Sequence, residues 1–182
     1  MGGTFDPIHL GHVAMAGAGA RCAGLDRVLV VPASVPPHRA DATAPAADPR
    51  LEVSEVELRR EGPSYTVDTL RQLAAERPGD ELHLLLGWDA AREIRSWRSP
   101  DEVMRLARLV VVSRPGYPVP SETDLRAAGI DPGRALLCDA RTPGVESTEV
   151  RRLAEQGLDL AGLVDPAVGG YLREHRLYAR RG

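Results

Sequence analysis

Short apolar runs alternate along the chain with segments whose apolar residues recur at helical spacing. Five runs predict strands, and all but the second lack the polar alternation of half-exposed strands, as expected where both faces are covered. They are residues 27–32, 51–58, 81–87, 108–113 and 134–138. The helical segments are residues 11–22, 66–77, 100–106, 123–128, 148–156 and 166–174. Strands that alternate with helices at this spacing predict an α/β fold with a doubly wound parallel sheet.

One stretch shows neither pattern. Residues 39–50 are rich in alanine, aspartate and proline and have no periodicity, which is typical of a mobile surface loop. The total of 182 residues fits one domain, so we expect residues 1–182 to form a single domain. Within it, residues 145–182 hold the last two predicted helices and form a small helical C-terminal part.

Charge and composition exclude several kinds of protein. The chain has 23 basic and 26 acidic residues, and a net charge of −3 offers no basic surface to nucleic acid. Its apolar runs are too short to cross a bilayer, so we expect no membrane partner. All 23 basic residues are arginine, which excludes a mechanism based on a lysine base or a Schiff base.

The two cysteines, Cys22 and Cys138, are too few for a disulfide framework or a thiolate zinc site. We interpret them as small buried residues, and a reduced, cytoplasmic location is the default expectation.

The chain opens with a dense group of chemically useful residues. Gly2 and Gly3 are followed by Phe-Asp-Pro and by His-x-Gly-His, all immediately before the first predicted helix. Paired glycines let backbone amides approach a ligand closely, and a helix N-terminus favours an anion at that point. His9 and His12 add donors aimed at the same place, and imidazoles can carry charge as phosphate charge develops. The alternative is a tight turn with two incidental histidines.

This segment resembles the signature of the nucleotidyltransferase superfamily, whose Rossmann-like enzymes transfer a nucleoside monophosphate from ATP or CTP and release pyrophosphate. The resemblance implies that His9 and His12 are catalytic and stabilise the triphosphate and the pentacoordinate transition state, without a covalent enzyme intermediate. Phosphoryl transfer of this kind needs positioning and charge stabilisation more than covalent chemistry. The resemblance also implies an ATP site that includes Gly2, Gly3, Thr4, Phe5 and Gly11.

A second group of polar residues opens the helix predicted near residue 148. Ser147 is predicted as its N-cap, whereas Arg151 would lie unfavourably near the positive end of the helix dipole. A bound phosphate would reverse the sign of that interaction. The segment resembles the superfamily's second signature, Ile-Ser-Ser-Thr-x-Ile-Arg, which implies phosphate contacts from Ser147, Thr148 and Arg151. Glu146 replaces the first serine, and the alternative is a capped helix whose arginines are offset by its own glutamates.

The helix predicted at 66–77 opens with hydroxyls and backbone amides that could cradle a carboxylate or a phosphate. From the residues alone, an ordinary helix cap by Ser64 or Thr66 explains the pattern equally well. The run Ser-Tyr-Thr-x-Asp-Thr-Leu, however, resembles a motif of bacterial nicotinate-mononucleotide adenylyltransferases. That resemblance implies that Tyr65, Thr66 and Trp97 hold the pyridine ring and its carboxylate. Otherwise, Trp97 would be a half-buried surface aromatic residue.

Two further segments carry the same resemblance. Residues 35–39 end in His38 and Arg39, which the resemblance places at the substrate. The family usually has lysine where Arg39 stands, so the cation is kept with a different geometry. Gly87 and Asp89 follow a predicted strand, at the edge where open α/β sheets bind ligands, and the resemblance places them in the ATP site near the adenosine.

The resemblance covers essentially the whole chain, with two departures. The family has a hydrophobic strand immediately before the glycine pair, whereas here only Met1 precedes it. That strand is central in a doubly wound sheet, so we expect a missing first strand, unpaired neighbours and a chain truncated at its N-terminus. The family also has a helix between His38 and Leu51, where this chain has only the predicted loop.

Together, these motifs predict an adenylyltransferase that joins ATP and nicotinate mononucleotide to give nicotinate adenine dinucleotide and pyrophosphate, a step of NAD biosynthesis. We expect Mg²⁺ as the cofactor, bound mainly through ATP phosphates and water, and therefore no set of metal ligands in the protein. The alternatives are another nucleotidyltransferase, such as a phosphopantetheine adenylyltransferase, and a nucleotide-binding paralogue without catalysis. The sequence leaves a homo-oligomer open.

Overall fold

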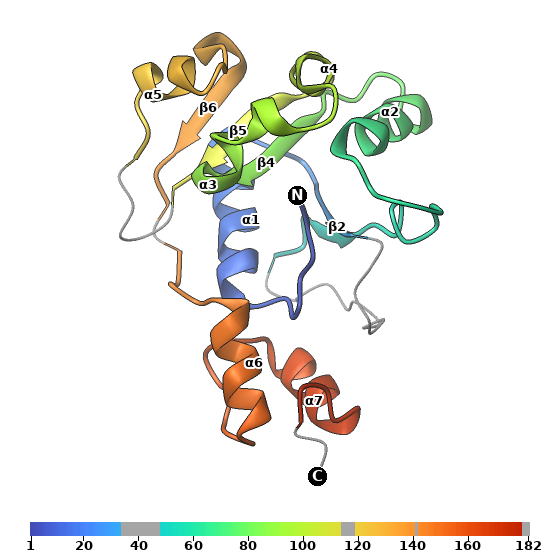
Figure 1. The fold of residues 1–182 in the computed structure, drawn as a ribbon, viewed down its shortest axis with the longest axis vertical. Coiled ribbons are helices and arrows are strands. Elements are labelled where there is room, and N and C mark those ends of the chain that lie inside the picture. Colours follow the sequence, from blue (N-terminus) through green and yellow to red (C-terminus); the bar gives the residue numbers. More distant parts are fainter. Residues whose placement is uncertain (34–47, 114–118, 141, 180–182) are drawn as a thin grey trace.

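The computed structural model describes residues 1–33, 48–113, 119–140 and 142–179. Strands lie between helices, and two helices near the C-terminal end form a separate small unit below them (Figure 1). The predicted α/β class is confirmed. Most of the predicted loop lies outside the described residues, and so do His38 and Arg39.

Strands and helices follow one another in the predicted alternating order. The strands are β1 (Gly2–Gly3), β2 (Val28–Pro32), β3 (Leu51–Val53), β4 (His83–Gly87), β5 (Arg108–Val112) and β6 (Ala135–Cys138). The α-helices are α1 (Leu10–Ala23), α2 (Thr66–Glu76), α3 (Trp88–Ala91), α4 (Pro100–Leu106), α5 (Glu122–Ala127), α6 (Ser147–Glu155) and α7 (Pro166–Glu174). Two short 3₁₀-helices span Ile94–Ser96 and Pro132–Arg134.

All the predicted strands and helices are present, and β3 alone departs from its predicted bounds by more than two residues. It ends at Val53 because the chain turns there, and the Arg59 amide donates to the Glu55 carbonyl at 3.1 Å. Within this turn Glu57 is buried, and the Thr69 hydroxyl of α2 donates to its carboxylate at 2.7 Å. The polar alternation after Val53 therefore belongs to a buried turn that packs against α2. The short elements β1 and α3 were not predicted.

The six strands form two parallel sheets of three strands each, in the orders β1-β2-β3 and β4-β5-β6. The predicted parallel arrangement is confirmed, but it is divided in two. A single doubly wound sheet would join β1 to β4. Among the described residues, β1 pairs with β2 and β4 pairs with β5.

The hydrophobic strand expected to be missing would lie before the glycine pair, whereas β1 consists of that pair itself. Its pairing with β2 begins at Met1, whose α-amino group donates to the Leu29 carbonyl at 2.8 Å. The Val31 amide donates in turn to the Met1 carbonyl at 2.9 Å. Gly2 and Gly3 carry no side chains that could produce an apolar run, which is why the sequence pattern does not reveal this strand. In the described part of the chain, the edge of β4 that faces away from β5 pairs with no strand, as expected.

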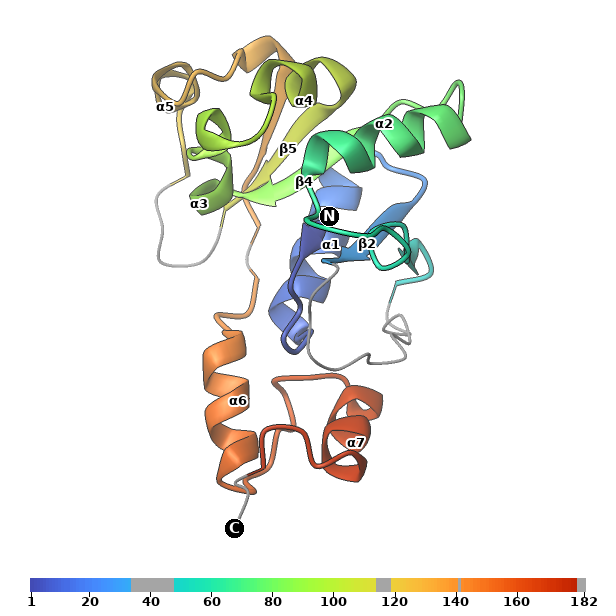
Figure 2. The same ribbon diagram turned by 45° about the vertical axis from the view of Figure 1, so that its right-hand side comes forward.

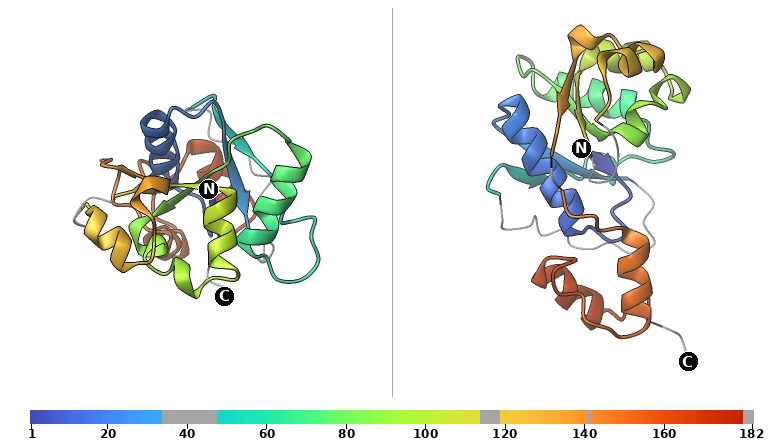
Figure 3. Two further views of the ribbon diagram at one scale, coloured as in Figure 1. Left: turned by 90° about the horizontal axis from the view of Figure 1, so that it is seen from above. Right: turned by 90° about the vertical axis from the view of Figure 1, so that its left-hand side faces the viewer.

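Two apolar clusters cover the two faces of the second sheet. One contains Leu84 and Leu86 together with residues of α2 and α4, and the other contains Leu85 and Val110 together with residues of α1. Figure 3 shows α1 on one side of these strands, with α2 and α4 on the other. Burial of both faces explains why the strands appear in the sequence as continuous apolar runs.

Helix α1 lies very close to the sheet because its inner face is built from small residues. Ala16 and Ala20 are fully buried, and a Cβ atom at Gly19 would lie 2.1 Å from the Cδ1 atom of Leu85. A larger residue at this position would push the helix away from β4. The close approach therefore fixes how far the amino end of α1 stands from the sheet.

The last two helices form a small unit with its own apolar cluster. The buried members of this cluster are Val150, Leu160, Val164 and Leu172. Helices α6 and α7 lie beyond the amino end of α1, on the side away from the second sheet (Figure 2). No helix among the described residues is long and apolar enough to span a membrane.

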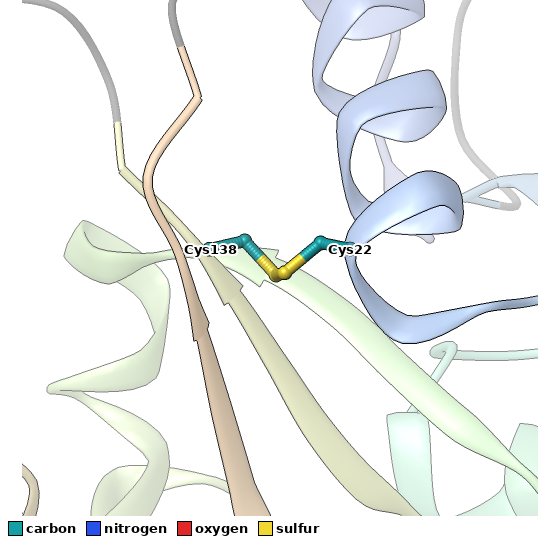
Figure 4. The surroundings of a disulfide bond; sticks show 2 residues. All are labelled: Cys22 and Cys138. Atoms are coloured by element: carbon teal, nitrogen blue, oxygen red, sulfur yellow. A yellow bond between two sulfur atoms is a disulfide. The ribbon is translucent and has the colours of Figure 1, made fainter.

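A disulfide bond joins Cys22 in the last turn of α1 to Cys138 at the end of β6 (Figure 4). The interpretation of both cysteines as small core residues holds for Cys138, which is buried, but not for Cys22, which is exposed, and their bond was not predicted. They are 116 positions apart in the sequence, and they meet only because α1 packs across the second sheet. A count of cysteines does not reveal such a tertiary contact. Stable disulfides are rare in a reducing cytoplasm, so this bond also counts against that default location.

The disulfide is predicted to contribute substantially to stability. Closing a loop of this length restricts the unfolded chain, and we expect Cys22→Ser to lower the free energy of unfolding by about 2–5 kcal/mol. Cys22 is the better position to replace, because it is exposed and a serine there buries no hydroxyl group. Urea denaturation with and without dithiothreitol measures the effect. If the reductant destabilises the Cys22→Ser variant as much as the parent chain, the assignment is contradicted.

The α-amino group of Met1 is buried beside β2. Burial lowers the pKa of this amine from 8.0 to about 6, and attraction to the Glu57 carboxylate opposes the shift. Between these two pKa values the unfolded chain binds more protons than the folded chain, so stability rises with pH. The penalty of burying the charged amine is fully present below the lower value and absent above the higher one.

For a chain that begins at Met1, we predict that the free energy of unfolding rises by about 3 kcal/mol between about pH 5 and about pH 9. Acetylation of the amine removes the titrating charge and should flatten this part of the profile. Urea denaturation of both forms across the range measures the difference. An identical pH dependence in the two forms would assign the effect to another group.

Candidate active site

The two predicted catalytic histidines stand at the amino end of α1. His9 is the N-cap residue, and His12 occupies the third position of the helix. The His12 amide donates to His9 Nδ1 at 3.4 Å, and the His9 amide donates to His12 Nδ1 at 3.3 Å. Each imidazole thus satisfies the backbone amide of the other residue, as serine and glutamate do in a capping box.

This reciprocal cap defines where the protons lie on both rings. A ring nitrogen that accepts a hydrogen bond carries no proton, so each neutral imidazole has its proton on Nε2. When neutral, both rings therefore carry an Nε2–H group at a helix N-terminus, where anions are favoured.

Aromatic packing fixes the orientation of the rings. Their centroids lie 3.7 Å apart in a stacked arrangement, and the ring of Phe5 meets that of His12 edge to face at 5.0 Å. A Cβ atom at Gly11 would lie 3.0 Å from the His9 ring and 3.2 Å from the Pro143 carbonyl oxygen. Gly11 is therefore needed for close packing of the ring and the loop.

A cavity of about 890 Å³ lies beside β1. Its lining includes Gly2 and Gly3, Thr66 at the start of α2, and Trp97. Thr4, the next residue of the first motif, is exposed. The cavity therefore brings the glycine pair together with two residues predicted to bind the nicotinate substrate, whereas neither histidine is among its lining residues.

The second motif contacts the first, although the contacting residues lie at least 140 positions apart in the sequence. The Ser147 hydroxyl donates to the Pro7 carbonyl at 3.1 Å, and Arg151 Nη1 donates to the Asp6 carbonyl at 2.6 Å. Arg151 Nη2 also donates to the Thr148 hydroxyl at 3.2 Å. Helix α6 therefore begins directly beside the loop that leads into the first histidine.

The N-cap of α6 is Glu146, so the prediction of Ser147 as the N-cap is wrong. The Ser147 hydroxyl contacts the first loop instead of capping the helix. No described side chain caps α6, which leaves its first amides as donors for a ligand. Arg151 forms its ion pair with Asp6, at 3.7 Å, rather than with the glutamates of its own helix.

Helix α2 also begins differently from the prediction. Its N-cap is Tyr65, whose side chain makes no capping bond, so the cap expected from Ser64 or Thr66 is absent. The Ser64 hydroxyl is buried without a hydrogen-bond partner in the described part of the chain. The Arg98 guanidinium lies over the Tyr65 ring, 4.6 Å from its centroid. Uncapped amides and the guanidinium place positive potential at this end of α2, and Asp68 in the first turn, which opposes it, is paired with Arg71.

The remaining predicted residues are more dispersed. Trp97 is half-buried, packs against the apolar cluster under α2 and α4, and lines the cavity. Gly87 ends β4 and is the N-cap of α3, and Asp89 is exposed in the first turn of α3. Both therefore stand at the carboxyl end of a parallel strand, as predicted.

Three residues of the site were not singled out in the sequence. Asp6 accepts hydrogen bonds from Arg151 and from the Tyr178 hydroxyl, and Arg98 covers Tyr65. Asp6 lies inside the first motif, which was a signal that could have been followed. Tyr178 is 172 positions from Asp6, and no local pattern indicates a contact over that separation.

Among the described residues, no group of three or more histidine, cysteine, aspartate or glutamate side chains is placed to hold a metal ion. The two motifs present imidazole, hydroxyl and guanidinium donors, which suit phosphate oxygens. The carboxylate of the first motif, Asp6, is paired with Arg151.

Two helix N-termini with imidazole and guanidinium donors, held side by side on a parallel α/β fold, are the arrangement of an enzyme that transfers nucleotidyl groups. The family described as cytidylyltransferase-like matches residues 1–153, and the chain belongs to that family. The resemblance identified in the sequence is thereby confirmed.

Known relatives define the similarity further. A probable nicotinate-nucleotide adenylyltransferase of Thermus thermophilus is 40% identical and spans 97% of this chain and 96% of its own length. One from Symbiobacterium thermophilum is 38% identical and spans 99% of this chain and 94% of its own. The Plasmodium falciparum nicotinic acid mononucleotide adenylyltransferase, solved with NaAD, has the same fold, with a TM-score of 0.75 at 17% identity. That match covers 97% of this chain and 94% of the other.

Substitutions at His12 should separate its capping role from its chemical role. Asparagine can place an oxygen where Nδ1 accepts the His9 amide, so we predict that His12→Ala is less stable than His12→Asn by about 1 kcal/mol. Both variants lose the Nε2–H donor and should lower kcat by about 10²–10³ with ATP affinity largely intact. Thermal denaturation and steady-state kinetics measure the two effects. Near-normal turnover of His12→Asn would remove Nε2 from the mechanism.

Proposed function

We propose that this chain joins ATP and nicotinate mononucleotide to give nicotinate adenine dinucleotide and pyrophosphate in NAD biosynthesis. Relatives bearing the name of that enzyme match the chain along nearly its whole length. The observation that carries the proposal is the contact between the two motifs, made by Ser147 and Arg151 with the first loop. This contact gathers imidazole, guanidinium and helix-terminal amide donors around one place, where they can hold a triphosphate.

The reaction is an in-line attack by a phosphate oxygen of the mononucleotide on the α-phosphorus of ATP. The bond from this phosphorus to the oxygen that bridges the β-phosphate breaks, and its electron pair leaves with pyrophosphate. We assign His12 to the charge that develops on the α-phosphate, and His9 and Arg151 to the departing pyrophosphate. Ser147 and Thr148 add hydroxyl donors beside Arg151.

Magnesium is the proposed cofactor, since nucleotidyltransferases generally use a divalent metal ion. When bound, it neutralises phosphate charge and polarises the phosphorus–oxygen bonds. The described residues offer it no cluster of carboxylates, so phosphate oxygens and water would hold it. The donors of the two motifs then bind and orient the nucleotide.

The other predicted site residues keep their proposed roles. Those that would shape the ATP site from the first loop are Gly2, Gly3, Thr4, Phe5 and Gly11. Gly87 and Asp89, at the carboxyl end of β4, are proposed to lie near the adenosine. Those proposed to bind nicotinate mononucleotide are Tyr65, Thr66, Trp97, His38 and Arg39.

We further propose that residues 1–182 act as one domain in the cytoplasm, where the substrate ATP is abundant. The Cys22–Cys138 disulfide is the observation against this location, and thiol labelling in intact cells tests it. Both motifs come from the same chain, so the proposed reaction requires no second subunit.

The alternatives drawn from the sequence gain no support from the site. A phosphopantetheine adenylyltransferase would have no use for the electropositive end of α2, with Arg98 over Tyr65, as a site for a pyridine carboxylate. Retention of both histidines counts against a paralogue without catalysis, which would bind ATP without turnover.

The acceptor preference is the direct test of the proposal. We predict that kcat/KM is about ten- to a hundredfold higher for nicotinate mononucleotide than for nicotinamide mononucleotide. The first amides of α2 have no side-chain cap and need an acceptor, which a carboxylate supplies. An amide ligand would turn N–H groups toward them and leave them unpaired, at a cost of about 1–3 kcal/mol.

Release of pyrophosphate with each acceptor measures the preference, and the KM for ATP in both assays is the control. Equal efficiency with the two acceptors would overturn the assignment of α2 to the carboxylate.

A further inference from the structure

The C-terminal unit contacts Asp6 at its carbonyl oxygen and at both of its carboxylate oxygens. Its carbonyl oxygen accepts a hydrogen bond from Arg151 Nη1 at 2.6 Å, and its carboxylate Oδ2 lies 3.7 Å from the same nitrogen. Its other carboxylate oxygen, Oδ1, accepts a hydrogen bond from the Tyr178 hydroxyl. The proposed mechanism uses Arg151 but gives no role to Tyr178 or to the Asp6 side chain.

The chain after α7 has an unusual backbone conformation, which places the Tyr178 hydroxyl beside Asp6. Arg176 and Tyr178 both have left-handed backbone conformations, with φ of 50° and 63°, which residues with side chains adopt at a cost. The Leu177 amide donates to the Leu172 carbonyl at 3.0 Å and closes the turn. Tyr178 is half-buried and packs against the apolar cluster of the C-terminal unit. The ring is therefore held in place, with its hydroxyl on Asp6.

The phenol keeps its proton under ordinary assay conditions. Burial raises the pKa of Tyr178, and the hydrogen bond to Asp6 and the charge of Asp6 raise it further. An O–H group that donates to a carboxylate restricts its rotation and takes up part of its negative charge.

We propose that Tyr178 is a positioning residue for ATP that acts through Asp6 on Arg151, an inference that rests on the proposed function. The phenol holds Oδ1, so only Oδ2 faces the guanidinium, at 3.7 Å. The Asp6 carbonyl sets the direction of Arg151, which keeps further N–H donors for the triphosphate.

Loss of the phenol would change what Arg151 offers to ATP. The Asp6 carboxylate would be able to turn both oxygens toward the guanidinium in a two-pronged ion pair. That pair would compete with the phosphates for the same donors, and the unshared carboxylate charge would repel them. The effect falls on ATP binding, because Arg151 already holds, in bound ATP, the phosphates that later leave as pyrophosphate, and an interaction present in both states changes KM rather than kcat.

The test measures the affinity of the full chain for α,β-methylene-ATP with Mg²⁺ by isothermal titration calorimetry, without an acceptor. Tyr178→Phe keeps the ring and removes the hydroxyl, and it should raise the Kd by about five- to tenfold. In the complete reaction, KM for ATP should rise in parallel while kcat stays within about twofold. The matched control is Tyr171→Phe, which removes a hydroxyl from the same unit and should leave the Kd within about twofold.

An Asp6→Asn background distinguishes positioning from a merely structural role. If Tyr178 acts through the Asp6 carboxylate, Tyr178→Phe should raise the Kd no further in that background. The proposal is overturned if the full increase persists there, or if Tyr178→Phe binds the analogue as tightly as Tyr171→Phe. A lower Tm together with an unchanged Kd also overturns it.

The outcome for the parent chain separates this inference from the proposed function. A parent chain that binds the analogue, with no effect of Tyr178→Phe, removes the inference alone. A parent chain that fails to bind the analogue removes both.

Discussion

The mutual cap of His9 and His12 is the interaction on which the rest of the site depends. Each ring uses Nδ1 to satisfy a backbone amide and therefore carries its proton on Nε2 when neutral. A serine or aspartate would cap the helix equally well, but its capping oxygen would leave no donor of this kind. An imidazole can both cap a helix and carry an N–H donor, so the residues that cap the amino end of α1 also carry the Nε2–H groups. Their place relative to the sheet is set by the close contact of α1 with β4 at Gly19.

The C-terminal unit contacts the amino end of α1 and the loop that precedes it. The Leu10 amide, one of the first amides of α1, donates to the Leu163 carbonyl at 2.8 Å. Ser147 and Arg151 hold the carbonyl groups of the preceding loop. Backbone groups that a helix end leaves unsatisfied are thus paired by a segment far away in the sequence. The unit is therefore a structural support of the first motif as well as the carrier of the second.

Local patterns in the sequence were sufficient for most of the fold, and they named several of the residues that meet at the amino end of α1. Continuous apolar runs predicted the buried strands, because β4 and β5 have helices on both faces. The dense motif before α1 predicted that the two histidines stand at the start of this helix, because both lie within a few residues of its first residue.

What the sequence could not show depends on long-range contacts or on the absence of side chains. β1 is made of two glycines and leaves no hydrophobic signal. Serine is a residue type typical of N-caps, but the Ser147 hydroxyl donates to a carbonyl oxygen 140 positions away. Cys22 and Cys138 lie 116 positions apart, and only the packing of α1 on the sheet pairs them.

The Cys22–Cys138 bond has a topological consequence. It divides the polypeptide into a covalent ring, residues 22–138, and two free ends. The first motif lies in one end and the second motif lies in the other, so the phosphate site assembles outside the ring. Because the bond anchors both ends near each other, each motif experiences the other at a high effective concentration. A single backbone break inside the ring would still leave the two halves of the site tethered together.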